Sequence, residues 1–273
     1  MRRWFHLVGV EWLKARSLYG FGITITAQLV VFLVLIFVGA NFDVHLQGVS
    51  VRPFFEFPHV WETFAWVLGW LNFFTAIGFI VIVGSEFGEK TFLFQLVSGL
   101  TRIELVVSKI LLAFVISIAW FLVLLTLGFA FGLYFSPSDS LLPLLPGLQV
   151  FSAFFLRTFS LLLVAMLIAF ILRNTAVSIL VFVVLFSLAP VVPSIIPEAI
   201  SWMMPFQAMQ NLTPTPDFFG LAVLNHPELS ALKRSITLAP PYSTSLWLSS
   251  IATFVYSCAY MIAMVATVRR RSF

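Results

Sequence analysis

The stretch GSEFGEKTFLFQLVSGLTR, residues 84–102, nearly matches a nucleotide-binding loop and lies between two long apolar runs. A P-loop has the pattern Gly, four residues, Gly-Lys and then Ser or Thr, and its glycines let backbone N–H groups surround phosphates. Lys90 and Thr91 fit this pattern, but Glu89 replaces the second glycine and would bring a carboxylate into the phosphate site. The preceding residues 63–84 carry no charge and are long enough to cross a membrane. We therefore do not expect the chain to bind ATP by itself.

The composition is that of a membrane protein. Hydrophobic residues make up 61% of the chain and charged residues 10%, whereas an ordinary soluble domain has about 25% charged residues. The apolar runs have the length that a membrane-spanning helix needs and lie at about 19–40, 63–84, 106–134, 150–172, 175–197 and 247–268. We expect an all-α membrane protein with six transmembrane helices, a single domain over residues 1–273, and a first span that is retained rather than cleaved.

The basic residues predict the orientation, because Lys and Arg collect on the cytoplasmic side of a membrane. With six spans, eleven of them fall on the side of the termini and three on the opposite side. The larger group is Arg2, Arg3, Lys14, Arg16, Lys90, Arg102, Lys109, Arg173, Arg269, Arg270 and Arg271, and the smaller is Arg52, Lys233 and Arg234. Both termini should therefore be cytoplasmic. We take the net charge of +4 as a topology signal and expect no nucleic-acid partner.

Segments outside the spans also carry a pattern. Residues 1–18 suggest an interfacial helix, although charge and aromatic residues flanking a span would look similar. Its apolar face would hold Trp4, Phe5, Val8 and Trp12, and its polar face Arg2, Arg3, His6 and Lys14. The outer loop should cover residues 198–246. Its residues 198–210 are apolar enough to lie against the outer leaflet or to dip into it.

Residues 86–100 should form a short helix between the second and third spans. Gly99 can end this helix in a left-handed conformation. Thr101 and Glu104 then have the spacing of a capping box that begins the third membrane helix. The short helix would expose Phe92, Phe94 and Leu96, which is unfavourable in water unless a partner or lipid covers them.

This segment resembles a known family, the ABC-2 type transporter permeases. In that family an acidic residue ends the second helix, a Thr follows five residues later, and a Gly or Pro-x-x-Arg turn leads to a Lys that opens the third helix. Glu86-Phe-x-x-x-Thr91, the run Ser-Gly-Leu-Thr-Arg ending at Arg102, and Lys109 are similar to this pattern. Glu11-Trp-Leu-Lys14 also resembles the family's basic prelude, and FPHVWETFAWV at 57–67 the start of its second helix.

The resemblance implies an ABC-2 (type V exporter-like) permease fold whose cytoplasmic coupling helix docks on a separate ABC ATPase subunit. ATP and Mg would then bind to that partner, with no cofactor, metal or catalytic residue in this chain. A second permease subunit, identical or related, would complete the export pathway in the lipid of a bacterial inner membrane. The implied coupling residues are Glu86, Phe87, Glu89, Lys90, Thr91, Phe92, Phe94, Leu96, Gly99, Arg102 and Lys109. Without a partner, the same residues would form only a solvated loop with snorkelling ends.

Other classes of membrane protein remain as alternatives. An ion-coupled carrier usually places acidic or histidine relays inside its helices, but all eleven acidic residues and the four histidines fall outside the apolar runs or at their edges. An intramembrane enzyme needs a nucleophile beside a base or clustered metal ligands, and the sequence gathers neither. A scaffold subunit without transport activity fits the same layout.

Apart from Lys109 at the start of the third run, Arg157 is the one charge inside a span. It could face a cavity and meet an anionic or lipid headgroup. Equally, it could snorkel outward or pair with a backbone carbonyl or a partner subunit, and we favour this structural role. Polar residues of the spans, Gln28, Asn72, Thr75 and Ser160, are expected to join helices rather than bind ligands.

The charge count predicts the outcome of a labelling experiment. A cysteine at Ser230 should react with a membrane-impermeant reagent added from outside, and one at Ser272 should not. The opposite labelling pattern would overturn the orientation.

Overall fold

The computed structural model describes most of the helical part of the chain. The described residues are 2–41, 45–46, 49–50, 52–88, 94–95, 97, 99–136, 144–191, 195–196, 198–213, 215–216 and 246–270. Their elements are α1 (Arg2–Ser17), α2 (Tyr19–Asn41), β1 (His45–Leu46), β2 (Val49–Ser50), the 3-10 helix η1 (Arg52–Phe55), α3 (His59–Gly88), α5 (Arg102–Phe135), α6 (Leu144–Leu172), α7 (Thr175–Leu188), α9 (Glu198–Ser201), α10 (Pro205–Asn211) and α13 (Leu246–Arg270).

Five helices among the described residues are long and apolar enough to cross a membrane: α2, α3, α5, α6 and α13. This confirms the all-helical class, but the count of six spans is not confirmed. Within the run at 175–197, the described residues form the 14-residue α7, which ends at Leu188. Pro190 explains the early end, because its ring removes a backbone N–H and clashes with the preceding turn. At about 1.5 Å per residue α7 is roughly 21 Å long, less than the thickness of a bilayer core.

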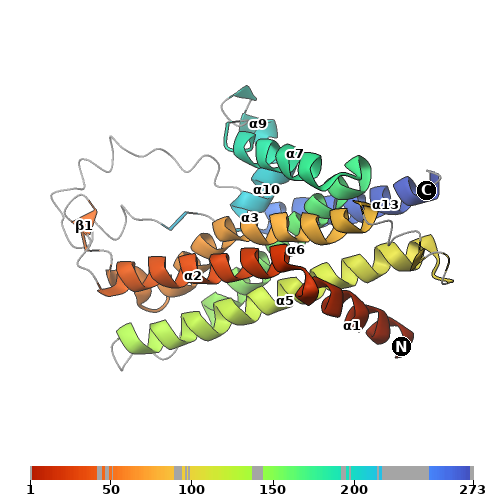
Figure 1. Ribbon diagram of the computed structural model, residues 1–273. Coiled ribbons are helices and arrows are strands. Elements are labelled where there is room, and N and C mark those ends of the chain that lie inside the picture. The colour runs from red at the N-terminus through yellow and green to blue at the C-terminus, as the bar shows by residue number, and fades with distance from the viewer. Residues whose placement is uncertain are drawn as a thin grey trace.

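Helices α3 and α6 form the centre of the bundle. In the most apolar stretch of each of these helices, 67% of the residues are buried, compared with 22% in α2 and in α13. Figure 1 shows the start of α1 and the end of α13 at the same end of the bundle, near the first turn of α5, with β1 at the opposite end. Both chain ends therefore lie at the same end of the bundle. The 30 residues of α3 extend over about 45 Å, so this helix projects beyond a hydrocarbon core of about 30 Å.

The segments at the far end are more ordered than the sequence predicts. A two-stranded antiparallel ladder, in which His45 pairs with Ser50, interrupts the loop between α2 and α3. Within the predicted outer loop, α10 packs against α6 and α13. The Tyr256 hydroxyl, ten residues into α13, donates a hydrogen bond to the Met203 carbonyl oxygen at 2.7 Å. This segment therefore dips about 15 Å along α13 and does not lie across the end of the helix.

A polar network joins α2, α3 and α6 inside the bundle. The Gln28 amide nitrogen donates to Asn72 Oδ1 at 2.8 Å, and the Thr75 hydroxyl donates to Gln28 Oε1 at 2.5 Å. The Asn72 amide nitrogen donates in turn to the Thr158 hydroxyl at 2.7 Å. All four side chains are buried, so the expected joining role is confirmed for Gln28, Asn72 and Thr75. The Ser160 hydroxyl, by contrast, has no hydrogen-bond partner among the described residues.

Two glycines of α5 contact aromatic side chains at the start of α3 and just before it. A Cβ atom at Gly128 would lie 2.6 Å from the Trp61 ring, and one at Gly132 would collide with the Phe57 ring. Because glycine has no side chain, these rings can pack directly on the helix backbone, as small residues allow in membrane helices. The Phe57 backbone N–H also donates to the Ser136 hydroxyl at 2.8 Å. The end of α5 is thus fixed to the start of α3.

This contact predicts opposite results for two glycine-to-alanine changes. Gly128→Ala should lower the thermal unfolding midpoint of the purified protein, because the added methyl group displaces Trp61 from a close-packed contact; overpacking of this kind costs about 1–3 kcal/mol. Gly22→Ala is the control, since nothing lies within 4 Å of the added Cβ and alanine is the better helix former. Equal midpoints for the two variants would contradict the packing.

Candidate functional site

The end of the predicted short helix has the expected geometry, although its first residues, 86–88, are the last residues of α3 and residues 89–93 lie outside the described residues. Gly99 has a φ angle of 94°, so it occupies the left-handed region that favours glycine. The Leu100 backbone N–H donates to the Gln95 carbonyl oxygen at 3.2 Å, which is the six-to-one bond of a Schellman motif. The helical turn that includes Phe94, Gln95 and Val97 therefore ends at Gly99, as the sequence predicts.

Helix α5 begins directly after this turn with a complete capping box. The Thr101 hydroxyl accepts a hydrogen bond from the Glu104 backbone N–H at 3.3 Å. The Glu104 carboxylate accepts one from the Thr101 backbone N–H at 2.8 Å. Only Leu100 separates the Gly99 stop from this cap, so the chain turns through a short, hydrogen-bonded corner.

The turn exposes a small apolar surface, Phe94 and Val97. Their side chains are 72% and 87% exposed, which confirms the predicted exposure of Phe94. The other predicted coupling residues of this stretch, Glu89, Lys90, Thr91, Phe92 and Leu96, lie outside the described residues.

A cluster of four charged residues, three of them buried, lies next to this segment. The Lys109 ammonium group donates to a carboxylate oxygen of Glu86 at 2.5 Å and also contacts Glu11. The Lys14 ammonium group lies 3.3 Å from Glu11 and 3.3 Å from Glu86. We call these four residues the ion cluster. Its formal charges balance, and it joins α1, the last turn of α3 and the first turns of α5.

The burial of this cluster changes the predicted role of two residues. Lys109 is only 1% exposed and Glu86 is also buried, so neither offers a surface to a partner subunit. They hold the two helices that carry the exposed turn, and any part in coupling would be structural. The sequence assigns Glu11 and Lys14 to the basic prelude and not to the site, and only their Glu-x-x-Lys spacing indicates that they could pair.

Helix α1 forms in the segment where a helix is predicted near the N-terminus, and of the residues assigned to its two faces only Trp12 and Lys14 have described side chains. Glu11 and Ala15 are buried, and Lys14 is directed to the ion cluster rather than to water alone. Trp12 and Leu13 are exposed on the outer side, where lipid could cover them.

The remaining predicted coupling residues lie at helix ends. The Phe87 ring packs on the Phe170 ring, with centroids 5.5 Å apart. The Arg102 guanidinium donates to the Val268 carbonyl oxygen at 3.2 Å, close to the C-terminal end of α13, where a cation is favourable. Arg102 thereby connects the start of α5 to α13.

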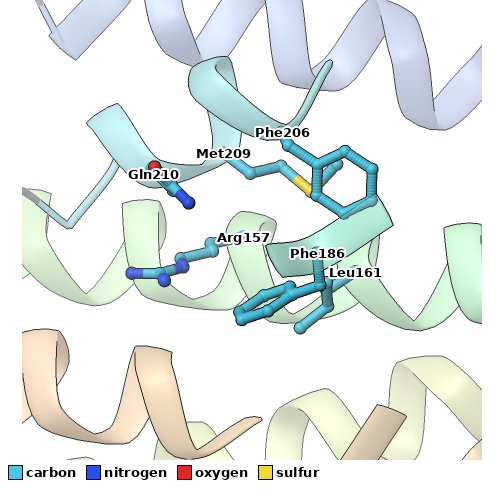
Figure 2. Close-up of a pocket in the computed structure, with 6 residues that line it drawn as sticks. All are labelled: Arg157, Leu161, Phe186, Phe206, Met209 and Gln210. Carbon is cyan, nitrogen blue, oxygen red and sulfur yellow. The ribbon is translucent and has the colours of Figure 1, made fainter. Parts of the chain in front are cut away.

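Arg157 forms a second polar site within the bundle, distant from the ion cluster. Its side chain is 4% exposed, so it does not snorkel to the surface. It lies beside Leu161 of α6, Phe186 of α7 and three residues of α10, Phe206, Met209 and Gln210 (Figure 2).

Comparisons with known proteins do not identify a family for this chain. No protein-family model, no curated protein and no solved structure matches the chain. The features that bear on function are therefore the exposed turn and the ion cluster.

Replacing Lys109 should destabilise the protein strongly. Lys109→Met leaves Glu11 and Glu86 with only Lys14 to neutralise them, and removing one partner of a buried ion pair costs about 3–5 kcal/mol. Adding Glu86→Gln restores the charge balance, since Glu11 and Lys14 remain paired. Thermal unfolding in detergent should show a large fall in the midpoint for Lys109→Met and partial recovery in the double variant.

Lys14→Met is the matched control. The Lys14 side chain is 35% exposed, so its charge is worth less than that of Lys109. Equal losses for Lys14→Met and Lys109→Met, or no recovery in the double variant, would contradict the role given to the cluster.

Proposed function

We propose that this chain is the membrane-spanning permease subunit of an ABC transporter, coupled through residues 86–102 to a separate ATPase subunit. One observation carries the proposal. A single helical turn exposes Phe94 and Val97 at the end of the bundle where both chain termini lie. This segment is too short to be a domain, and its exposed apolar side chains are unfavourable unless another surface covers them.

The chemistry of the turn suits a protein partner. Phe94 and Val97 would supply an apolar centre, and the neighbouring Glu104 and Arg102 a polar rim. Protein interfaces commonly have this division. A buried aromatic side chain at the centre of an interface often contributes far more than a rim charge. The residues outside the described ranges, Glu89, Lys90, Thr91, Phe92 and Leu96, would extend the same surface.

The connections of the turn suit the transmission of movement. On one side the capping box ties the turn to α5. On the other side α3 continues without a break to Gly88, and Glu86 is paired with Lys109 of α5. A displacement of the turn by a partner would therefore move α3 and α5 together. The two helices cannot hinge freely against each other, because a hinge needs residues that absorb a change in backbone angles and the ion pair holds these helix ends in place. ATP and Mg would act on the partner, and this chain would supply the pathway.

The proposed assembly contains two permease subunits, identical or related, and two ATPase subunits in a bacterial inner membrane, with both termini cytoplasmic. Export is the proposed direction, and the two membrane subunits would form the pathway between them.

An ion-coupled carrier is the second candidate, favoured by one observation. Glu11 and Glu86 are both buried, and buried carboxylates can serve as proton relays. Their pairing with Lys109 and Lys14 speaks against this use, because the ammonium groups occupy the carboxylate oxygens that a relay would need. Transport that stops when a proton ionophore is added and continues without ATP would favour the carrier.

The double variant Phe94→Ala/Val97→Ala should release the ATPase. The full chain is purified from its native membrane together with the ABC ATPase that copurifies with it, and the dissociation constant of the pair is measured. Losing a central anchor costs about 2 kcal/mol or more, so affinity should fall by about 30-fold. ATP-driven transport should fall with it, while membrane insertion is unchanged.

Ile262→Ala is the control, because Ile262 is equally exposed but lies on α13. It should leave the affinity for the ATPase unchanged. If no ABC ATPase copurifies with the chain, or if the double variant keeps both affinity and ATP-driven transport, the permease proposal is wrong.

A further inference from the structure

Arg157 is a buried cation without a counter-charge among the described residues. It lies on α6, eight residues beyond Gln149, where the apolar span begins, or about 12 Å along the helix. Its guanidinium makes no hydrogen bond or ion pair with another described residue. A charge inside a membrane protein is costly unless it is paired or solvated. The guanidinium therefore needs an acceptor that the described residues do not supply.

Two further buried donors lie beside the guanidinium. The amide nitrogen of Gln210 and the hydroxyl of Thr213 are buried and have no hydrogen-bond partner among the described residues. Figure 2 shows Gln210 on α10 with its amide nitrogen directed toward Arg157. Arg157 and Thr213 both approach the backbone of Gly69 on α3. A Cβ atom there would lie 2.8 Å from Arg157 Cζ and 3.2 Å from Thr213 Oγ1.

Gly69 is thus the position that makes room for this group of donors. Any side chain at residue 69 would displace the guanidinium from its place between α3 and α10. Three elements, α3, α6 and α10, therefore contact one another around a group of polar side chains inside an otherwise apolar bundle.

A small cavity lies next to these donors. Its volume is about 10 Å³, and Leu161, Phe186, Phe206 and Met209 line its apolar side. This is room for one group about the size of a water molecule. A water molecule would satisfy a donor but would leave the positive charge of Arg157 unbalanced. An amide oxygen of Gln210 turned toward Arg157 would have the same shortcoming.

We propose that Arg157, Gln210 and Thr213 form a binding site for an oxyanion, the phosphate group of an anionic lipid or free phosphate, with one of its oxygens in the cavity. The planar guanidinium offers several donors to a phosphate. The amide and hydroxyl supply two more, and the apolar wall excludes water, so that each bond is stronger than in solution. An anionic lipid can reach this depth because a bilayer thins locally around a buried arginine, which brings the headgroups closer. The site does not depend on the proposed transport function.

Binding is tested on the purified full chain in neutral detergent. Retention of phosphatidylglycerol and of phosphatidylcholine is measured by native mass spectrometry, and the unfolding midpoint is followed with each lipid and with inorganic phosphate at constant ionic strength. The wild-type chain should bind phosphatidylglycerol, or inorganic phosphate, and unfold at a higher temperature when it does. Arg157→Met should weaken this binding at least about tenfold, the effect expected for a lost charged hydrogen bond.

Thr213→Val and Arg269→Met complete the design. Thr213→Val keeps the shape and charge of the site and should weaken binding by a few fold. Arg269 is exposed at the end of α13, so Arg269→Met removes the same charge and should leave binding unchanged. Without an anion, Arg157→Met should unfold at the same or a higher temperature than the wild type, because it removes an unpaired buried charge.

The lipid and phosphate arms separate the two sources of the anion. A shift with phosphatidylglycerol alone supports a lipid headgroup, and an equal shift with inorganic phosphate supports an aqueous anion. The proposal is overturned if neither anion binds, if Arg157→Met binds as tightly as the wild type, or if Arg157→Met unfolds much earlier while Thr213→Val binds normally. That last result would mean that Arg157 is a structural residue.

Discussion

The ammonium group of Lys109 is the point on which the end of the bundle near the chain termini depends. It contacts carboxylates from α1 and α3 while lying on α5, so three helices share one buried charge. Taking these groups out of water is expensive, and their mutual attraction offsets the cost only if the geometry is kept. The cluster therefore fixes the mutual positions of α1, α3 and α5 more strictly than apolar packing would.

Several other features follow from this constraint. Glu86 can reach Lys109 only because α3 continues past the apolar run to Gly88. The path of α1 is set in the same way: Glu11 and Ala15 face inward, and Trp12 and Leu13 face outward. The exposed turn at Phe94 and Val97 therefore lies next to helix ends that the ion cluster holds together. Deeper in the bundle, the network of Gln28, Asn72, Thr75 and Thr158 joins α2, α3 and α6 with neutral groups only, as suits the low dielectric of that region.

How much of this the sequence predicts depends on the distance over which each interaction acts. The Gly99 stop and the Thr101–Glu104 cap are local chemistry, and both are predicted correctly. The five long spans follow from length and hydropathy. The pairing of Glu11 with Lys109 joins residues far apart in the chain, and no local pattern indicates it. The same holds for α10 beside Arg157. The end of α7 at Leu188 again has a local cause, because Pro190 breaks a helix, but the continuous hydropathy of residues 175–197 indicates a longer span.

The early end of α7 also changes how one wall of the bundle can move. A continuous helix such as α6 responds to force as a rod, since bending it would break backbone hydrogen bonds. Along the line of α7 and α10 the wall consists of two separate short helices, joined side to side by contacts such as that of Phe186 with Phe206, whose centroids are 6.4 Å apart. Aromatic contacts of this kind cost only about 0.5–1.5 kcal/mol to separate beyond the area that they bury. The two short helices can therefore separate from each other without breaking a hydrogen bond within either helix.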